Sequence, residues 1–323
     1  IISYLENTSE DVIFNALPLA FDYGLYQLLM AVRVGATLVL EKSFAFPAAA
    51  FDIMRRENVT GLPLVPTMAA LILQMRGLAA GSVPSLRYIT NTAAALPVEH
   101  IDRLRRLFPG SSLFSMYGLT ECKRCTYLPP SELERKPGSV GIPIPGTEAY
   151  VVDENGLAVA PGAVGELVVQ GPHVMQGYWR DEAATARALR PGPNAALPAL
   201  HTGDLFKRDD EGFLYFVGRR DDIIKTRGEK VAPKEVEAVL HAHPDVVEAV
   251  VAGVDDPILG KAVSALVVVR DGSITERELI RHCQRHLEDF MVPKYLAFAT
   301  SLPKTETGKV SRRLAAEALE AVR

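Results

Sequence analysis

Apolar runs alternate with amphipathic stretches along the first third of the chain. Val12–Leu19 predicts a buried strand, Leu25–Val34 carries apolar residues at helical spacing, and Ala36–Leu40 predicts another strand. The same alternation continues through Phe51–Glu57, Thr60–Val65, Met68–Gln74, Leu86–Thr90 and Glu99–Leu107. Strands that alternate with helices are typical of an α/β fold, here an open, mostly parallel sheet covered by helices.

Two changes of pattern divide the rest of the chain. From Pro129 onward, prolines and glycines interrupt the chain every few residues, and short alternating runs follow at Ala149–Val152 and Glu166–Val169, which predicts a small β-barrel-like subdomain. After Gly218 a charged segment precedes helix and strand patterns that predict a separate small α+β domain. We therefore expect a partial α/β subdomain over 1–130, the β subdomain over 131–218 and a mobile C-terminal domain over 219–323.

Composition narrows the classes of protein that fit this pattern. The chain has 323 residues, 48% of them hydrophobic and 23% charged, which excludes a disordered or disulfide-scaffold protein. Lys and Arg total 35 against 39 Asp and Glu, a net charge of −4, so no basic excess favours nucleic-acid binding. No apolar run is long enough for a transmembrane segment. Three cysteines in a chain of this length predict a reducing, cytoplasmic setting.

Tyr117-Gly118-Leu119-Thr120-Glu121 combines residue types that suit a nucleotide site. The ring of Tyr117 can stack on a base, Thr120 can donate to a phosphate oxygen and Glu121 can hold Mg²⁺. A strand end followed by a turn explains the same five residues equally well.

Three further segments have the same ambiguity. Asp204, which follows Thr202-Gly203, can accept hydrogen bonds from a ribose diol, although an aspartate in a β-turn fits as well. The charged segment from Gly218 to Val231 predicts a turn between domains that also faces a ligand. Pro303–Lys309 lacks the spacing of a Walker phosphate loop and predicts a loop that presents one lysine.

The order of these segments resembles that of the adenylate-forming enzyme superfamily, which includes acyl-CoA synthetases, amino-acid adenylation domains and firefly-type luciferases. The resemblance rests on the Tyr-Gly-x-Thr-Glu segment, the Thr-Gly-Asp segment, the charged hinge segment that begins at Gly218 and the Pro-Lys-Thr-x-x-Gly-Lys loop. Gly165-Glu166-Leu167 and Gly177-Tyr178-Trp179 match a further family segment, and all of them occur in the family's order.

The resemblance implies two half-reactions, in which a carboxylate and MgATP give an acyl-adenylate and a thiol then takes the acyl group. It assigns to Lys309 the bridging of carboxylate and α-phosphate, to Thr120 a phosphate contact and to Glu121 the Mg²⁺. It assigns Tyr117 to the adenine, Asp204 to the ribose hydroxyls, and Arg219 to the ribose or a phosphate.

The resemblance also implies a moving C-terminal domain. Asp221 is the expected hinge, and Gly228 is expected to leave room for pantetheine at the thiol channel. The turn that contains Asn91 and Ala93 is expected on the adenine side, although it lacks the glycines usual in the family. The family's phosphate loop lies upstream of Ile1, so we expect this chain to be the central and C-terminal part of a longer enzyme.

The identity of the acid is left open by the sequence. The resemblance places Asp22, Tyr26, Arg124 and Cys125 at the acyl pocket, where Asp22 pairs with an α-amino group in amino-acid-activating relatives and Arg124 could hold a second carboxylate. Asp22 could instead pair with Arg124 or cap the helix that starts near Leu25. With Cys283 as the one other cysteine, Cys122 and Cys125 do not predict a zinc site.

The sequence therefore predicts an ATP-dependent carboxylate–thiol ligase of the acyl-CoA synthetase type. Its expected cofactors and substrates are ATP, Mg²⁺, a small carboxylic acid and coenzyme A or a phosphopantetheine carrier. The alternatives are an amino-acid-activating enzyme that loads a carrier protein and a non-catalytic nucleotide- or acyl-binding relative. The sequence does not indicate an oligomeric state.

Overall fold

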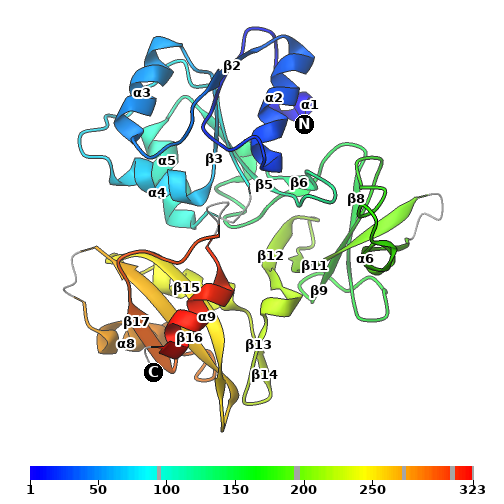
Figure 1. The fold of residues 1–323 in the computed structure, drawn as a ribbon, viewed down its shortest axis with the longest axis vertical. Coiled ribbons are helices and arrows are strands. Elements are labelled where there is room, and N and C mark those ends of the chain that lie inside the picture. Colours follow the sequence, from blue (N-terminus) through cyan, green and yellow to red (C-terminus); the bar gives the residue numbers. More distant parts are fainter. Residues whose placement is uncertain (93–95, 193–196, 271–273, 306–309, 322–323) are drawn as a thin grey trace. The chain divides into compact units, whose positions relative to one another are not determined.

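The computed structural model describes residues 1–92, 96–192, 197–270, 274–305 and 310–321 (Figure 1). The chain forms two compact units, the first comprising Ile1–Thr202 with Phe206–Phe216 and the second Gly203–Leu205 with Val217–Arg323. The main division therefore lies within two residues of the expected start of the C-terminal domain. The expected division at residue 130 falls inside the first unit.

A seven-stranded sheet organises the first part of the first unit. Its order is β2-β1-β3-β4-β5-β6-β7, and the five strands from β2 to β5 run parallel whereas β6 and β7 pair antiparallel. The strands are β1 (Val12–Asn15), β2 (Thr37–Leu40), β3 (Gly61–Leu64), β4 (Tyr88–Asn91), β5 (Ser112–Tyr117), β6 (Thr126–Tyr127) and β7 (Ile142–Pro143). This arrangement confirms the predicted open, mostly parallel α/β sheet.

The helices between these strands begin and end where local chemistry favours it. Pro47 and Pro66 occupy first-turn positions of α3 and α4, where a missing N–H costs nothing, and α2 ends at Gly35 with a φ of 74°. The core beneath them includes Phe51, Met54 and Leu62. The helical elements of this part are α1 (Ile2–Leu5), α2 (Asp22–Val34), α3 (Pro47–Arg56), α4 (Pro66–Gln74), α5 (Val98–Leu107) and the short 3-10 helix η1 (Pro130–Glu132).

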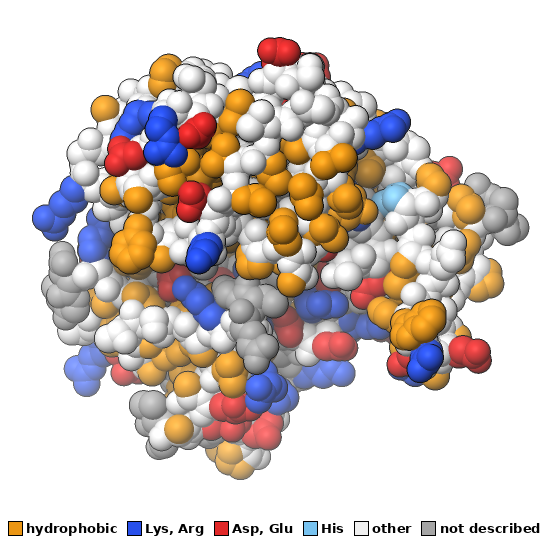
Figure 2. All heavy atoms as spheres, turned by 45° about the horizontal axis from the view of Figure 1, so that its top comes forward, with side chains coloured by type: hydrophobic (Ala, Val, Ile, Leu, Met, Phe, Trp, Pro, Cys, Tyr) orange, Lys and Arg blue, Asp and Glu red, His pale blue; other side chains and the backbone are white. Residues whose placement is uncertain are grey.

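The outer face of α2 is apolar. Leu25, Leu29 and Val32 follow one another at helical spacing and are 39%, 49% and 73% exposed. Figure 2 shows hydrophobic side chains gathered over this part of the first unit. These apolar side chains contribute to the helical pattern in the sequence, although they lie on the exposed face of the helix.

The predicted β-barrel-like subdomain is a five-stranded sheet with its own core. The path β10-β11-β9-β8, with β12 paired to β11, does not close on itself among the described residues. Cys122, Cys125, Leu167 and Phe206 belong to the core beneath it. Its elements are β8 (Glu148–Val152), β9 (Val164–Gln170), α6 (Glu182–Ala188), β10 (Leu189–Pro191), β11 (Pro198–Arg208) and β12 (Leu214–Arg219).

The second unit is an α+β domain, as predicted. Its sheet has the order β14-β13-β16-β15, with β17 parallel to β16. Neighbouring residues of β15 face opposite sides, because Val251 packs in the core with α7 and α8 whereas Val250 packs with α9. Its elements are η2 (Arg220–Asp222), β13 (Ile224–Thr226), β14 (Glu229–Val231), α7 (Pro233–His241), β15 (Val246–Asp256), β16 (Gly260–Val269), α8 (Glu276–His286), β17 (Tyr295–Phe298) and α9 (Arg312–Ala321).

Among the described residues, no helix combines the length and the apolar character that crossing a membrane requires.

Candidate active site

The Tyr-Gly-x-Thr-Glu segment forms a tight connection between β5 and β6. The Lys123 amide donates to the Leu119 carbonyl at 2.6 Å, and the Cys125 amide donates to the Tyr117 carbonyl at 2.9 Å. A Cβ on Gly118 would collide with the Lys123 carbonyl, so glycine is required for this close approach. Thr120 is exposed and Glu121 is half-buried, so this connection presents a hydroxyl beside a carboxylate.

A tyrosine that sequence reasoning did not single out as a site residue orients Glu121. The Tyr178 hydroxyl donates to Glu121 Oε1 at 2.7 Å, and the Met175 amide donates to the Glu121 carbonyl at the same distance. The signal in the sequence was the Gly177-Tyr178-Trp179 segment, which gave no hint of its spatial partner. The carboxylate thus has a fixed orientation at the surface.

The ring of Tyr117 belongs to an aromatic group. It meets Phe206 edge-on at a centroid distance of 4.8 Å and lies 6.3 Å from Phe216 in a stacked orientation. These contacts fix the ring and leave it half-buried.

Asp204, predicted to bind the ribose, and Arg219, predicted to bind the ribose or a phosphate, pair with each other in the second unit. Arg219 Nε lies 3.1 Å from Asp204 Oδ1, and the aspartate is buried whereas the arginine side chain is 60% exposed. The guanidinium therefore compensates the buried carboxylate and holds it in place.

The expected hinge residue Asp221 is exposed in η2. Its neighbour Asp222 accepts from Arg312 Nη1 at 3.0 Å, and Arg312 Nη2 donates to Glu237 at 2.6 Å. Burial opposes ionisation of Glu237, but Lys234, Arg312 and the Val251 amide hold the pKa of this carboxyl below its ordinary value. The residue next to Asp221 is therefore anchored to the body of the second unit.

Gly228 closes the hairpin between β13 and β14. Arg227 and Gly228 have φ values of 52° and 83°, the signature of a two-residue turn that matches the twist of the strands. Gly228 is exposed and nothing lies within 4 Å of where its Cβ would be. An exposed glycine with open space around it is compatible with the room expected for a pantetheine arm.

The predicted acyl-pocket residues separate into two groups. Tyr26 and Arg124 line a groove of about 390 Å³, together with Ile1, Ile2, Ser3, Leu29, Met30, Arg33, Lys123, Ile144 and His173. Cys125 does not line it: this thiol is fully buried, 3.0 Å from the Cys122 sulfur, within the core of the β subdomain. Asn91, expected at the adenine-side turn, is buried at the end of β4.

Both local interpretations offered for Asp22 are wrong. Asp22 pairs with Lys123 rather than Arg124, with Lys123 Nζ 3.5 Å from Asp22 Oδ2 and donating to the Asp22 carbonyl. It is the first residue of α2 rather than its cap, which is Phe21. Because Asp22 is an acidic residue in the first turn, its negative charge still interacts favourably with the helix dipole.

Lys123 is the basic residue that sequence reasoning missed in this groove. Its ammonium lies 3.2 Å from the centroid of the Tyr26 ring, and its backbone φ is 64°, unusual for a residue other than glycine. Burial lowers the pKa of Lys123 to about 8, even though Asp22 raises it. Arg124 beside it is buried over the Tyr23 ring at 4.7 Å.

Lys309 and Ala93 lie outside the described residues. On one side of the predicted lysine loop, Lys304 pairs with Glu248 at 3.5 Å.

Two family models match the chain. Residues 2–179 match the AMP-binding enzyme, and residues 235–309 match the AMP-binding enzyme C-terminal domain. The chain belongs to the AMP-binding enzyme family. Tyr117 lies within the first matched range, and Lys309 is the last residue of the second.

Named relatives of the chain include CoA ligases. The chain is 36% identical to the probable CoA ligase CCL9 of Humulus lupulus, over 93% of this chain and 57% of that relative. It is 34% identical to a long-chain-fatty-acid–CoA ligase of Salmonella typhimurium, over 96% of this chain and 54% of the relative. The chain thus spans about half the length of the curated relatives it matches.

A solved structure extends the similarity to three dimensions. O-succinylbenzoate coenzyme A synthetase from Bacillus subtilis, in complex with ATP and magnesium ion, is 32% identical and matches with a TM-score of 0.85. The match covers 97% of this chain and 62% of that one.

Proposed function

We propose that the full-length protein is an AMP-forming acyl-CoA synthetase, which converts a carboxylic acid and ATP to an acyl-adenylate and then to a CoA thioester. The matches to both family models and the CoA ligase relatives support this activity. The observation that carries the proposal is the Thr120–Glu121 pair, in which Tyr178 fixes the carboxylate beside an exposed hydroxyl.

The residues present fit MgATP. Among the described residues no three acidic, histidine or cysteine side chains form a cation cage, and Glu121 offers a single oriented carboxylate. Mg²⁺ is commonly held by one or two carboxylates together with substrate phosphates and water, so one carboxylate is the expected protein share. When bound, the cation would neutralise negative charge on the phosphates. Thr120 is the proposed hydrogen-bond donor to a phosphate oxygen, and Tyr117 is the proposed adenine contact.

The other roles in the proposal come from the family motifs. Asp204, oriented by Arg219, would accept from the ribose hydroxyls. Lys309 would stabilise charge that develops between the carboxylate and the α-phosphate. Asp221 would be the hinge between the half-reactions, and Gly228 would leave room for the pantetheine arm of coenzyme A. The cytoplasmic setting predicted from the cysteine content belongs to this proposal as well.

The groove suggests the class of acid. Arg33, Lys123 and Arg124 line it, and none of its described lining residues is acidic, while Leu29, Met30 and Ile144 supply apolar walls. We propose an acid with an apolar body and a second anionic or strongly accepting group, held by Lys123 and Arg124.

The contacts of Asp22 disfavour the amino-acid-activating alternative. In that alternative Asp22 is needed for the ammonium of the substrate, but Lys123 already lies against this carboxylate. A second cation there would face Lys123 at close range.

Carboxylate-dependent exchange of pyrophosphate into ATP tests the proposed activity. The full-length protein is assayed with fatty, aryl, dicarboxylic and amino acids, with Lys309→Ala as the matched inactive variant and this chain as a second control. Exchange with one class of acid, lost in Lys309→Ala, is the expected result. Silence with every acid, while ATP binds, would favour the non-catalytic alternative.

A further inference from the structure

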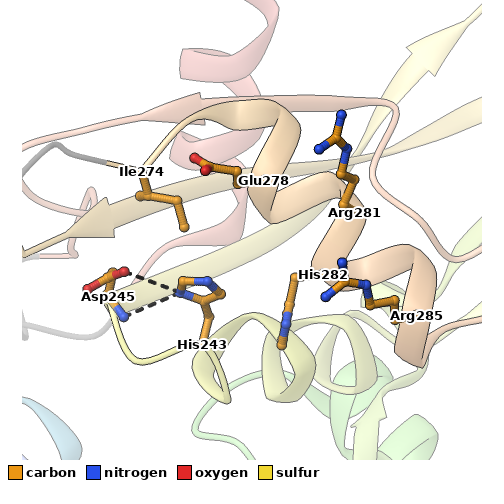
Figure 3. A pocket seen from close by; sticks show the side chains of 7 residues that line it. All are labelled: His243, Asp245, Ile274, Glu278, Arg281, His282 and Arg285. Carbon is orange, nitrogen blue, oxygen red and sulfur yellow. Dashed lines mark hydrogen bonds and ion pairs between the residues drawn. The ribbon is translucent and has the colours of Figure 1, made fainter.

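A polar pocket of about 510 Å³ lies in the second unit, and none of its lining residues belongs to the motifs described above (Figure 3). It opens between the connection from α7 to β15 and one face of α8. The charged and titratable residues that line it are His243, Asp245, Glu278, Arg281, His282 and Arg285.

The two carboxylates of the pocket contact residues that are close to them in the sequence. Glu278 Oε2 accepts from the amide and the hydroxyl of Thr275, at 2.8 Å and 2.7 Å, in the capping box that starts α8. Asp245 lies against His243, whose Nδ1 accepts from the Asp245 amide at 3.3 Å and is 3.8 Å from its carboxylate. Neither carboxylate lies within 4.0 Å of Arg281 or Arg285, although Arg281 still contributes to lowering the pKa of Glu278 from a longer distance.

The two guanidinium groups are exposed. No ion pair within 4.0 Å joins Arg281 or Arg285 to a described carboxylate. Figure 3 shows both arginines on α8, with the side chain of Arg285 beside that of His282. Two cations on successive turns of one helix repel each other and attract an anion.

Three histidine rings lie close together beside the two arginines. The ring of His282 lies 5.1 Å from that of His243 and 4.6 Å from that of His286, between centroids. His282 Nε2 donates to the Val239 carbonyl at 2.9 Å, which fixes the ring between α7 and α8. Burial lowers the pKa of His282, and the neighbouring His286, His243 and Arg285 lower it further against the effect of Val239. An anion in the pocket would relieve this repulsion.

We propose that this pocket binds a tetrahedral oxyanion of the phosphate class, with Arg281, Arg285 and His282 as its cationic partners. The residues of this site differ from the proposed adenylation residues, and its occupancy does not depend on the proposed function. Binding strengthens as pH falls, because protonation adds positive charge to His282 while Arg281 and Arg285 stay charged. Asp245 and Glu278 are the acidic groups that face the same pocket, and their negative charge opposes binding of an anion.

Titration of the histidine ring protons by NMR, in this 323-residue chain, tests the proposal. Sulfate is the first probe, because its charge does not change between pH 6 and pH 8, and sodium chloride at equal ionic strength is the control for screening. We expect saturable shifts for His282 and an affinity that falls about tenfold from pH 6 to pH 8. Inorganic phosphate and glycerol phosphate, titrated in parallel, distinguish the free ion from a phosphate ester, and tighter binding of either supports the site.

Matched variants locate the binding. Arg285→Gln is expected to weaken sulfate binding at pH 6 at least about fivefold. Arg277→Gln, on the same helix but outside the pocket, is expected to leave it unchanged. Arg281→Gln serves as the second test if the first variant melts early. Equal losses in Arg277→Gln and Arg285→Gln, or shifts that chloride reproduces, would overturn the proposal.

Discussion

Each unit contains a cluster of buried or half-buried charges, but only one of the two clusters is balanced. In the second unit Arg312 and Lys234 meet Glu237 and Asp222 at distances from 2.6 to 3.0 Å, and Arg312 also donates to the Val251 carbonyl. In the first unit, Lys123 and Arg124 have Asp22 as the one described carboxylate within 4.0 Å of either.

The difference separates a structural network from a candidate binding site. Balanced charges that join η2, α7 and α9 satisfy one another, so nothing from outside is needed. Burying an excess of positive charge beside an open groove costs free energy unless an anion binds there. Imbalance of charge, rather than burial alone, is therefore the basis of the proposal that this groove binds an acidic substrate.

Breaking the balanced network is expected to have the largest effect. Arg312→Met leaves the buried Glu237 carboxylate without its closest cation and is expected to destabilise the second unit by about 3 kcal/mol. The neighbouring Arg313→Met removes an exposed pair with Glu317 and is expected to cost less than about 0.5 kcal/mol. Urea unfolding of both variants measures the difference, and similar losses would show that the network is not structural.

Removing the unbalanced charge is expected to affect the acid rather than the fold. Lys123→Met in the full-length protein is expected to raise KM for the acid about 30-fold, close to 2 kcal/mol, with little change in kcat. Lys207→Met is the matched control, because Lys207 also lies over a tyrosine ring, that of Tyr215, but is exposed. A large loss of stability with an unchanged KM would make Lys123 a structural residue instead.

The pH dependence of KM tests the same role of Lys123. Because the pKa of Lys123 is lowered from 10.5 to about 8, its charge is lost as pH rises through 8, and KM for the acid is expected to rise about eightfold between pH 7 and pH 9. Lys123→Arg, which stays charged, should abolish this rise. The lowered pKa also affects stability. Between pH 8 and 10.5 the Lys123 side chain is protonated in the unfolded chain but not in the folded chain, so its contribution to the free energy of unfolding increases with pH across that window. A pH-independent KM would exclude Lys123 as an acid contact.

The smallest effect is expected where a carboxylate has a neutral partner. Tyr178→Phe removes the hydroxyl that orients Glu121 and is expected to raise the Mg²⁺ concentration needed for half-maximal exchange about fivefold, roughly 1 kcal/mol. Tyr150→Phe, a change of another tyrosine that contacts a glutamate in the β subdomain, is the control. An unchanged Mg²⁺ requirement in Tyr178→Phe would mean that the carboxylate does not need this orientation.

The sequence predicted most of the fold because buried strands and amphipathic helices carry strong local patterns. The strands near Val12, Thr60 and Val246 all lie where the apolar runs predict them. The short strands of the β subdomain were predicted as a class, but their path was not, since strand order depends on pairings between distant segments.

The candidate site was predicted less completely, because its contacts join residues far apart in the sequence. Lys123 and Asp22 are 101 residues apart, and Tyr178 and Glu121 are 57 apart. Lys123 lay within a Cys-x-x-Cys spacing that drew attention to the thiols, and its contact with Tyr26 follows from the turn at Gly118. Local spacing identified the chemical groups, whereas the folded chain selected their partners.

The most direct test of the charge-imbalance account compares two acids of equal length, one ending in a methyl group and one in a second carboxylate. Pyrophosphate exchange is measured for both with the full-length protein and with Lys123→Met. The account predicts at least a tenfold preference for the diacid that Lys123→Met removes. A preference for the methyl-ended acid that is the same in both proteins would contradict it.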